Sequence, residues 1–416
     1  MQTAGTRRSF LRGLTYVGSA AASVGQLRPM LAAVAGGDSY WNLVKEQFPL
    51  RPGKIPMNAA NLCPSPRSVA ERVAELTRDL DADVSFQNRD KFHATLEASR
   101  RKVAGQLGVS AEEIALVRNT SEANNVINNG LSLKPGDEIV LFDQNHPTNN
   151  VAWDVRAARF GYTVKRVAVP STVKDPGDVV RLFESALGPK TRVLSITYVS
   201  NTTGIRLPAR ELCELARRRG IYAHVDGAQV WGALNLNLRD IGCDSFSSSA
   251  HKWLMGPKEA GVLYVRQERI AQIWPSIVAP GWGNKVETEA KGARKFETLG
   301  QRDDACLAAV GTAVDFHQMI GFDQVEARMM ELSSALKQGL ARTRGARLVT
   351  PIDPRLSAGV VVTRFEGADA QKIYQQIYAK HGVGGAGTGG LRLCPHVYNT
   401  MEDVERAIRA VTEVTG

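Results

Sequence analysis

Two charged residues, Asp226 and Lys252, lie at the ends of segments that are apolar or built from small side chains. Asp226 directly follows the apolar run 221–225, and Lys252 follows the small residues 247–250. The apolar run predicts a strand that ends in a carboxylate, and the small residues predict a loop that exposes the amine. A lysine amine can form an imine with an aldehyde, and a carboxylate can keep a pyridine nitrogen protonated. The pair therefore predicts a pyridoxal phosphate site for chemistry at the α-carbon of an amino acid.

A helix start that carries several hydroxyl groups is predicted at Asn119-Thr120-Ser121-Glu122. Asn119 can cap the helix, and Glu122, three residues later, completes a capping-box pattern. The amides of the first turn, together with the hydroxyls of Thr120 and Ser121, can bind a phosphate. A plain capped helix has the same pattern, so the motif alone leaves both interpretations open.

Four further polar residues follow expected strands or flank the lysine: His146, Asn201, Ser249 and His251. His146 can stack on a pyridine ring, although a single histidine is more often structural. Asn201 can reach the edge of a cofactor or shape its own turn. Ser249 and His251 flank Lys252 and can donate further hydrogen bonds to a phosphate.

Alternating apolar strands and helices are expected to position these residues. Residues 208–219, for example, have Pro in the first turn, arginines in the last turn and Gly220 as the stop, as helices do. The alternation predicts an α/β fold with a mostly parallel sheet covered by helices, which binds ligands beyond the carboxyl ends of its strands. The expected strands are 114–117, 138–142, 163–169, 193–199, 221–225 and 261–265, and the expected helices are 120–129, 149–160, 178–187 and 208–219.

The pattern changes after about residue 283. The expected elements there are helices at 304–320, 325–342 and 368–381 and a strand at 359–364. We therefore predict a large domain over residues 61–282 and a smaller C-terminal α/β domain over residues 283–416, which residues 36–60 complete. Glycines gather in residues 382–390, which predicts a mobile loop.

Composition and charge argue against several other classes of protein. The chain has 416 residues, is 43% hydrophobic and carries a net charge of +10, so a sizeable core is expected and disorder is not. Its basic residues are scattered and are not interleaved with aromatics, so we expect no nucleic-acid partner, whereas an anionic substrate would suit a basic surface. The five cysteines have no metal-ligand spacing, so we expect no metal site.

The N-terminal segment is typical of a twin-arginine export signal. Arg7 and Arg8 precede a mildly apolar stretch, residues 13–24, and residues 33–35 read Ala-Val-Ala, a small-residue cleavage site. An ordinary basic tail or an organelle transit peptide is the alternative. We expect residues 1–35 to be a leader that the twin-arginine export machinery recognises, with the mature enzyme in the periplasm or otherwise exported. The apolar stretch is too short to anchor the chain stably in a membrane.

Taken in order along the chain, these residues resemble the class V aminotransferases, which are pyridoxal-phosphate enzymes of fold type I, and the resemblance covers nearly all of the mature chain. It implies that Lys252 forms the Schiff base, that Asp226 pairs with the pyridine nitrogen and that Arg392 grips the substrate carboxylate. Lys252, Asp226 and His146 are thereby the expected catalytic residues. The other implied contacts are phosphate binding by Thr120, Ser121, Ser249 and His251, ring stacking by His146, ring-hydroxyl contacts from Asn201 and Gln229, and substrate contact from Asn61.

Two departures from the family pattern refine the expectation. Cysteine desulfurases of this family have a catalytic cysteine shortly before the carboxylate arginine, but residues 382–390 contain no thiol and Cys394 comes after Arg392. Persulfide chemistry therefore lacks its nucleophile. Gln301 occupies the position of a family threonine that reaches the phosphate of a neighbouring subunit, and Arg302-Asp303 is similar to the isopenicillin N epimerase branch. The resemblance thus implies a homodimer with composite active sites, in which Gln301 or Arg302 has an intersubunit role.

The reaction itself stays open at this point. Once the α-proton of an amino-acid-like substrate is removed, transamination, epimerisation and loss of a β-substituent all use the same electron sink. We expect an exported aminotransferase or epimerase, with a C–S lyase as the alternative. A non-catalytic binding scaffold is a further alternative, which the full set of residues argues against.

Overall fold

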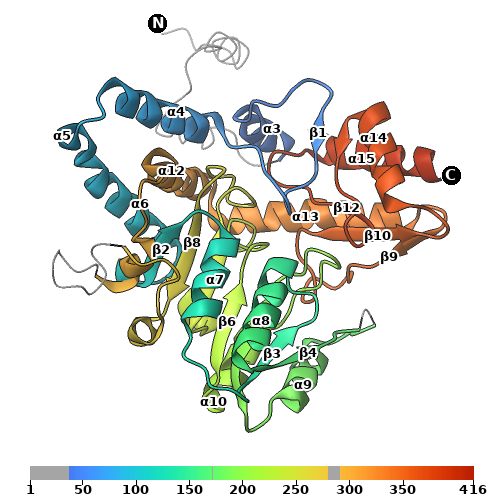
Figure 1. Cartoon of the computed structure of the whole chain (residues 1–416). Coiled ribbons are helices and arrows are strands. Elements are labelled where there is room, and N and C mark those ends of the chain that lie inside the picture. Colours follow the sequence, from blue (N-terminus) through green and yellow to red (C-terminus); the bar gives the residue numbers. More distant parts are fainter. Residues whose placement is uncertain (1–36, 171, 280–290) are drawn as a thin grey trace, which may run out of the picture.

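The computed structural model of the chain describes residues 37–170, 172–279 and 291–416 (Figure 1). The predicted leader, residues 1–35, lies outside the described residues, and so does the predicted domain boundary between residues 282 and 283. The export signal therefore stays a prediction.

A central sheet has the strand order β2-β8-β7-β6-β5-β3-β4. Neighbouring strands from β7 to β4 run parallel to one another, whereas β8 runs antiparallel to both β7 and β2. This arrangement confirms the predicted α/β fold with a mostly parallel sheet. The strands are β2 (Ile114–Val117), β3 (Glu138–Phe142), β4 (Thr163–Val167), β5 (Thr191–Thr197), β6 (Tyr222–Asp226), β7 (Ser245–Ser249) and β8 (Gly261–Val265).

The strand β7 was expected to be part of a loop of small residues. It reads Ser-Phe-Ser-Ser-Ser, and all five residues are buried. Buried hydroxyls are costly unless they form hydrogen bonds. Here the hydroxyl of Ser245 pairs with His224, that of Ser247 donates to Asn124, and that of Ser248 donates to the carbonyl of Gly227. Lys252 therefore follows a buried strand of the sheet.

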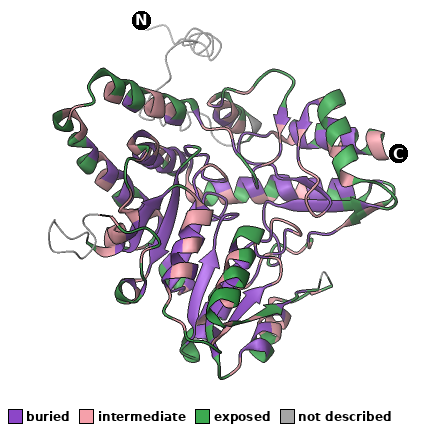
Figure 2. Ribbon diagram, in the orientation of Figure 1, coloured by how far each residue is buried: buried purple, intermediate pink, exposed green. Residues whose placement is uncertain are grey.

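Helices cover this sheet, with their outer faces exposed, and the strands are buried except for the edge strand β4 (Figure 2). Capping residues begin several of them: the imidazole of His146 accepts from the first turn of α8, and the carboxylate of Asp175 accepts from the first turn of α9. The covering helices are α7 (Thr120–Gly130), α8 (Pro147–Phe160), α9 (Pro176–Ala186), α10 (Ala209–Arg218) and α11 (Leu238–Ile241), and the 3-10 helix η2 (Gln267–Gln272) follows β8.

An N-terminal group of helices was not predicted. The two long ones, α4 and α6, pack against α12 (Asp304–Ile320). Side chains of all three belong to the same hydrophobic cluster as the central sheet. The N-terminal elements are α3 (Asp38–Glu46), β1 (Ile55–Pro56), α4 (Arg67–Ala82), α5 (Phe86–Arg89), α6 (Lys91–Leu107) and the 3-10 helix η1 (Ala111–Glu113).

The C-terminal part contains a second hydrophobic cluster, built from residues 332–411 together with Ile55 and Met57. An antiparallel sheet of order β12-β10-β9 lies within it, and β1 pairs with β11 in parallel. The predicted division into two domains stays a prediction, because α12 packs with the first cluster. The elements are η3 (Gly292–Glu297), α13 (Phe322–Ala341), β9 (Ala346–Leu348), β10 (Val361–Phe365), α14 (Ala370–His381), β11 (Val383–Gly384), β12 (Leu391–Leu393) and α15 (Met401–Thr415).

The glycine run, expected to be a mobile loop, is instead packed into the fold. It contains β11, and Ala386 forms an isolated bridge with Arg392. Gly389 has a φ of 76°, and a Cβ atom there would lie 2.0 Å from the carbonyl oxygen of Thr202. Only glycine permits this close approach to the turn that follows β5 without strain.

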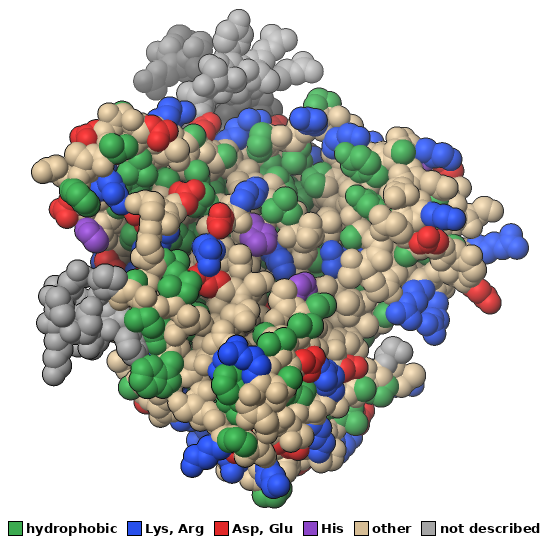
Figure 3. All heavy atoms as spheres, viewed as in Figure 1, with side chains coloured by type: hydrophobic (Ala, Val, Ile, Leu, Met, Phe, Trp, Pro, Cys, Tyr) green, Lys and Arg blue, Asp and Glu red, His purple; other side chains and the backbone are tan. Residues whose placement is uncertain are grey.

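Surface charge and helix hydropathy bear on possible partners. On the face shown in Figure 3, lysines and arginines are scattered among aspartates and glutamates. Within the described ranges, no single helix has the length and apolar composition to cross a membrane, and α12 and α13 reach them only as a pair bent by 78°.

Candidate active site

Lys252 lies in a tight turn immediately after β7. The amide of Met255 donates to the carbonyl of Lys252 at 2.8 Å, and Met255 itself has a φ of 56°, which is unusual for a non-glycine residue. Burial lowers the pKa of the Lys252 amine, and the positive charge of Arg392 adds to this effect while Asp226 opposes it. A larger fraction of the amine is therefore unprotonated and nucleophilic near neutral pH.

Asp226 ends β6 and is almost completely buried. Its Oδ2 accepts from Nδ2 of Asn124 at 2.9 Å, and its Oδ1 accepts from the amide of Ala228 at 3.0 Å. The Asn124 amide oxygen accepts in turn from Nε2 of His224 at 2.9 Å and from the hydroxyl of Ser247. These hydrogen bonds all join protein groups to one another, so they hold the Asp226 carboxylate in one orientation.

The histidine of this network is neutral. Burial lowers the pKa of His224 to about 4. The amide oxygen of Asn124 can only accept, so the imidazole proton lies on Nε2 and Nδ1 accepts from the hydroxyl of Ser245. The network therefore adds no charge near Asp226.

Thr120 and Ser249 are brought together at the start of α7. The hydroxyl of Ser249 lies 2.6 Å from that of Thr120 and accepts from the Thr120 amide at 2.8 Å. Asn119 caps the helix, as predicted, but the Glu122 carboxylate accepts from the amide of Arg118 rather than from that of Asn119. The capping box is therefore incomplete, and the hydroxyl pair at a helix N-terminus remains suited to an anion.

His146 lies within the electrostatic reach of the same residues. Burial lowers the pKa of His146, the charges of Lys252 and Arg392 lower it further, and Asp226 opposes them. Its Nδ1 lies 2.8 Å from the hydroxyl of Thr148 in the first turn of α8. The contact fixes one edge of the imidazole, and its stacking role stays a prediction.

Arg392 joins the C-terminal cluster to the site from β12. Its Nη1 donates to the carbonyl of Asn201 at 3.0 Å, and its Nη2 donates to the side chain of Asn58 at 3.1 Å. Its buried Nε has no hydrogen-bond partner within the described residues. A guanidinium held on two sides with a free donor is suited to a carboxylate ligand.

Two predicted contacts are placed differently from the rest. Asn61 is exposed on the turn that begins at Asn58, and its amide donates to the carbonyl of that residue. Gln229 is buried, and its carboxamide donates to the carbonyl of Ala60 at 3.0 Å and accepts from the indole of Trp253 at 2.8 Å. Gln229 is thus engaged within the protein, and its contact with a ring hydroxyl stays a prediction.

The remaining phosphate candidates are partly buried. Ser121 lies in the first turn of α7, where its carbonyl accepts from Asn125. Burial and the charges of Lys252 and Lys258 lower the pKa of His251 to about 4. The buried Nδ1 of His251 has no partner in the described part of the chain, so it remains available to a ligand.

Three residues that organise the site were not predicted: Asn58, Asn124 and His224. Asn124 lies one helical turn after Thr120 on α7, and Asn128 lies one turn further. Thr120, Asn124 and Asn128 are all buried, although the inner face of a helix is expected to be apolar. Polar residues at this spacing were the available signal, because buried polar groups require partners.

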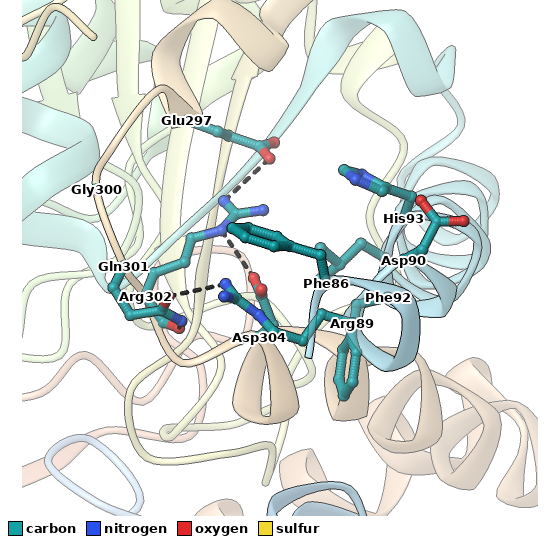
Figure 4. Close-up of a pocket in the computed structure, with 11 residues that line it drawn as sticks. Phe86, Arg89, Asp90, Phe92, His93, Glu297, Gly300, Gln301, Arg302 and Asp304 are labelled. Carbon is teal, nitrogen blue, oxygen red and sulfur yellow. Dashed lines mark hydrogen bonds and ion pairs between the residues drawn. The ribbon is translucent and has the colours of Figure 1, made fainter. Parts of the chain in front are cut away.

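Gln301 and Arg302 line a separate pocket of about 470 Å³ between α5, α6 and the start of α12. Arg302 lies between Glu297 and Asp304, at 3.2 and 3.0 Å, and Gln301 accepts from Arg89 at 2.8 Å (Figure 4). The pocket lining contains neither Lys252 nor any other predicted cofactor contact. The intersubunit role of Gln301 or Arg302 stays a prediction.

Cys394 is buried beyond Arg392, and burial raises the pKa of its thiol. A buried, protonated thiol is a poor nucleophile. Its main-chain amide donates to the carbonyl of Met57 at 2.6 Å. This hydrogen bond holds the end of β12 inside the fold. The position and burial of Cys394 agree with the absence of a desulfurase nucleophile from residues 382–390.

The sequence model of the aminotransferase class-V family matches residues 58–410. The chain belongs to this family. Two isopenicillin N epimerases, from Amycolatopsis lactamdurans and Streptomyces clavuligerus, are each 31% identical to it, over 90% of this chain and 98% of theirs. A probable cysteine desulfurase of Methanothermobacter thermautotrophicus is 26% identical over 90% of this chain and 98% of its own.

Solved structures share the fold of this class V enzyme. A variant of C-DES with glycine covalently linked to its pyridoxal phosphate is 24% identical, with a TM-score of 0.82 over 89% of this chain and 99% of that one. The apo cysteine desulfurase of Thermococcus onnurineus is 23% identical, with a TM-score of 0.80 over 89% and 97% of the two chains. The predicted fold type I architecture is thereby confirmed.

The class V enzyme uses pyridoxal phosphate, and its residues fit that cofactor. Asp226 offers a buried carboxylate for the pyridine nitrogen, Thr120 and Ser249 offer hydroxyls at a helix N-terminus for the phosphate, and Lys252 offers an amine of lowered pKa. Each group comes from the carboxyl end of a central strand or from the helix start that follows it, where ligands of α/β sheets bind.

Proposed function

We propose that this enzyme acts at the α-carbon of an amino acid or of a metabolite that contains one, by epimerisation or transamination. The observation that carries the proposal is the convergence of Asp226 and Arg392 on Lys252: burial lowers the pKa of the Lys252 amine, the charge of Asp226 raises it and that of Arg392 lowers it. The relatives named isopenicillin N epimerase, at 31% identity over almost their whole length, support an epimerase. The family description supports a transaminase equally.

Each residue has a defined task in this proposal. Arg392 binds the substrate carboxylate with its free Nε and one Nη, which orients the α-carbon toward Lys252. Pyridoxal phosphate, when bound, withdraws electrons from that carbon and so acidifies its proton. The Nζ atom of Lys252 then takes the proton, and Asp226, aligned by Asn124, keeps a proton on the pyridine nitrogen.

The fate of the α-proton distinguishes the candidate reactions. Its return to the opposite face of the α-carbon gives epimerisation. With the cofactor bound, transamination would instead release the substrate as a keto acid and pass its amino group to an acceptor keto acid. A C–S lyase would instead expel a sulfur substituent. The lack of a thiol in residues 382–390 speaks against the desulfurase route.

The deciding experiment incubates the purified enzyme in deuterium oxide with L- and D-amino acids, with and without a keto acid, and follows proton exchange by NMR and the enantiomers by chiral chromatography. Exchange of the α-proton with appearance of the opposite enantiomer supports epimerisation, and amino transfer to the keto acid supports transamination. Release of pyruvate or sulfide would contradict both of these reactions and favour the C–S lyase. An enzyme with the yellow absorbance of its bound cofactor that exchanges nothing would favour the scaffold, and Lys252→Ala is the matched inactive control.

Export and dimerisation also belong to the proposal. The Arg7-Arg8 motif and the Ala33-Val34-Ala35 segment support transport of the folded enzyme through the twin-arginine pathway. Cell fractionation of wild type and of an Arg7→Lys, Arg8→Lys variant tests it, because only the wild type should reach the periplasm. Intact Met1 on periplasmic material would contradict cleavage of the leader, and a monomer in sedimentation would contradict the homodimer.

A further inference from the structure

Two buried histidines contact the main chain directly after Lys252. Nε2 of His396 lies 2.8 Å from the carbonyl oxygen of Trp253, and Nε2 of His317 lies 3.1 Å from that of Leu254. Both side chains are fully buried. Carbonyl oxygens only accept, so in each ring the proton lies on Nε2 and is donated to the turn.

The two histidines come from different parts of the fold. His317 lies on α12, whereas His396 comes four residues after Arg392 on the same segment. The amide of His396 donates to the side chain of Asn399 at 3.0 Å, and the Asn399 amide donates back to the His396 carbonyl at 2.8 Å. This reciprocal turn fixes His396 relative to Arg392.

Trp253 is held from three directions. His396 holds its carbonyl, and Gln229, three residues after Asp226, accepts from its indole at 2.8 Å. Its ring also packs so closely on Gly359 that a Cβ atom there would lie 2.4 Å from the indole. Trp253, the residue that follows Lys252, is therefore tied both to the Asp226 segment and to the Arg392 segment.

We infer that His396 is a positioning residue, which holds the Trp253 carbonyl so that Lys252 keeps a constant orientation relative to Arg392. Peptide groups are planar, so fixing the carbonyl of Trp253 fixes the Trp253–Leu254 peptide group, which is the second peptide group after the Cα atom of Lys252. The inference rests on the role of Lys252 as the base. Burial lowers the pKa of His396 to about 3, so it remains a neutral donor across the working pH range.

Three substitutions at His396 test the donor. His396→Leu removes the N–H donor. His396→Gln supplies an amide N–H at a similar distance from the main chain. His396→Asn also supplies an amide N–H, but its side chain is too short to reach the Trp253 carbonyl. His317→Leu is the matched control, because it also leaves one buried carbonyl without a donor but on the next peptide and away from the Arg392 segment. Thermal unfolding of the cofactor-free proteins measures the stability loss of each variant.

The decisive readouts are the pH midpoint of the absorbance of the bound cofactor and the split between kcat and KM. We expect His396→Leu to move the midpoint by about half a unit and to lower kcat by about 10- to 100-fold, as small misplacements of a reacting group do. His396→Gln should restore both, and His317→Leu should lose stability without moving the midpoint. If His396→Leu does not fold, the difference between the Gln and Asn variants decides.

Two results would overturn the inference: an unchanged midpoint and kcat in every His396 variant, or equal changes in His317→Leu. Failure of the wild type to bind pyridoxal phosphate would instead contradict the role of Lys252 itself. The wild-type absorbance is therefore measured first, which keeps the two failures distinguishable.

Discussion

Asn124 offers the sharpest test of how the site is built. It is fully buried, and its carboxamide forms three hydrogen bonds: it donates to Asp226 and accepts from His224 and Ser247. Asn124→Ala removes all three at once. It leaves the Asp226 carboxylate with the amide of Ala228 as its remaining described donor.

The expected magnitude follows from these contacts. A hydrogen bond to a charged group contributes about 1.5–3 kcal/mol, and each buried polar group left without a partner costs about 1–3 kcal/mol. Alanine regains about 0.6 kcal/mol of helix propensity relative to asparagine. Taking the lower values, the free energy of unfolding of the cofactor-free protein should fall by about 3 kcal/mol. Affinity for pyridoxal phosphate should fall as well, because Asp226 is no longer aligned.

Urea unfolding followed by tryptophan fluorescence measures the change, with Asn125→Ala as the matched control. Asn125 is the next residue on α7, and its side chain donates only to the local carbonyl of Ser121, at 2.8 Å. The control gains the same helix propensity but should change the unfolding free energy by less than about 1 kcal/mol. Equal effects of the two substitutions, or a loss below about 1 kcal/mol for Asn124→Ala, would refute the argument that this network holds Asp226.

Three further outcomes are expected. Arg392→Lys should raise KM for the amino-acid substrate by about 10- to 100-fold with a smaller change in kcat, because lysine cannot bind a carboxylate bidentately; steady-state kinetics would contradict this if kcat alone fell. Gly389→Ala should destabilise the protein by about 1–3 kcal/mol, because the new Cβ would lie 2.0 Å from the Thr202 carbonyl oxygen, and an unchanged melting temperature would contradict it. Burial lowers the pKa values of His224, His317 and His396 to about 4, 4 and 3 from 6.5. Since the unfolded chain binds their protons first, stability should be complete above about pH 6.5 and fall toward pH 4, by about 2 kcal/mol for each histidine at pH 5; urea titrations without such a slope would contradict the burial of neutral imidazoles.

The sequence alone predicted the α/β architecture because its signals are local. Apolar runs marked β2, β3 and β8 with the bounds that the structure has, and the Pro, Arg and Gly punctuation around α10 placed that helix within a residue at each end. The serine-rich strand β7 was not predicted, because four serines in five residues have no apolar pattern. Its hydroxyls become favourable in a buried strand only when His224, Asn124 and Gly227 supply partners from elsewhere in the chain.

The site shows the same division. Residue type and order predicted Lys252, Asp226, Thr120 and Arg392, since an amine, a carboxylate, a hydroxyl at a helix start and a guanidinium each have chemistry of their own. Asn58 was missed, because which asparagine of its turn meets Arg392 depends on how β1 and β12 are brought together, and the substrate contact of Asn61 stays a prediction.

By itself, the sequence determined which reactive groups this protein carries and the order in which they occur along the chain. Local propensities and the reactivity of single side chains are properties of short segments, so they can be inferred without a structure. Only the tertiary structure decided how Asp226 is aligned, which nitrogen carries the proton in the buried histidines and what holds the chain after Lys252. Those properties depend on burial and on hydrogen bonds between residues more than a hundred positions apart, such as His396 and Trp253, and packing alone creates them.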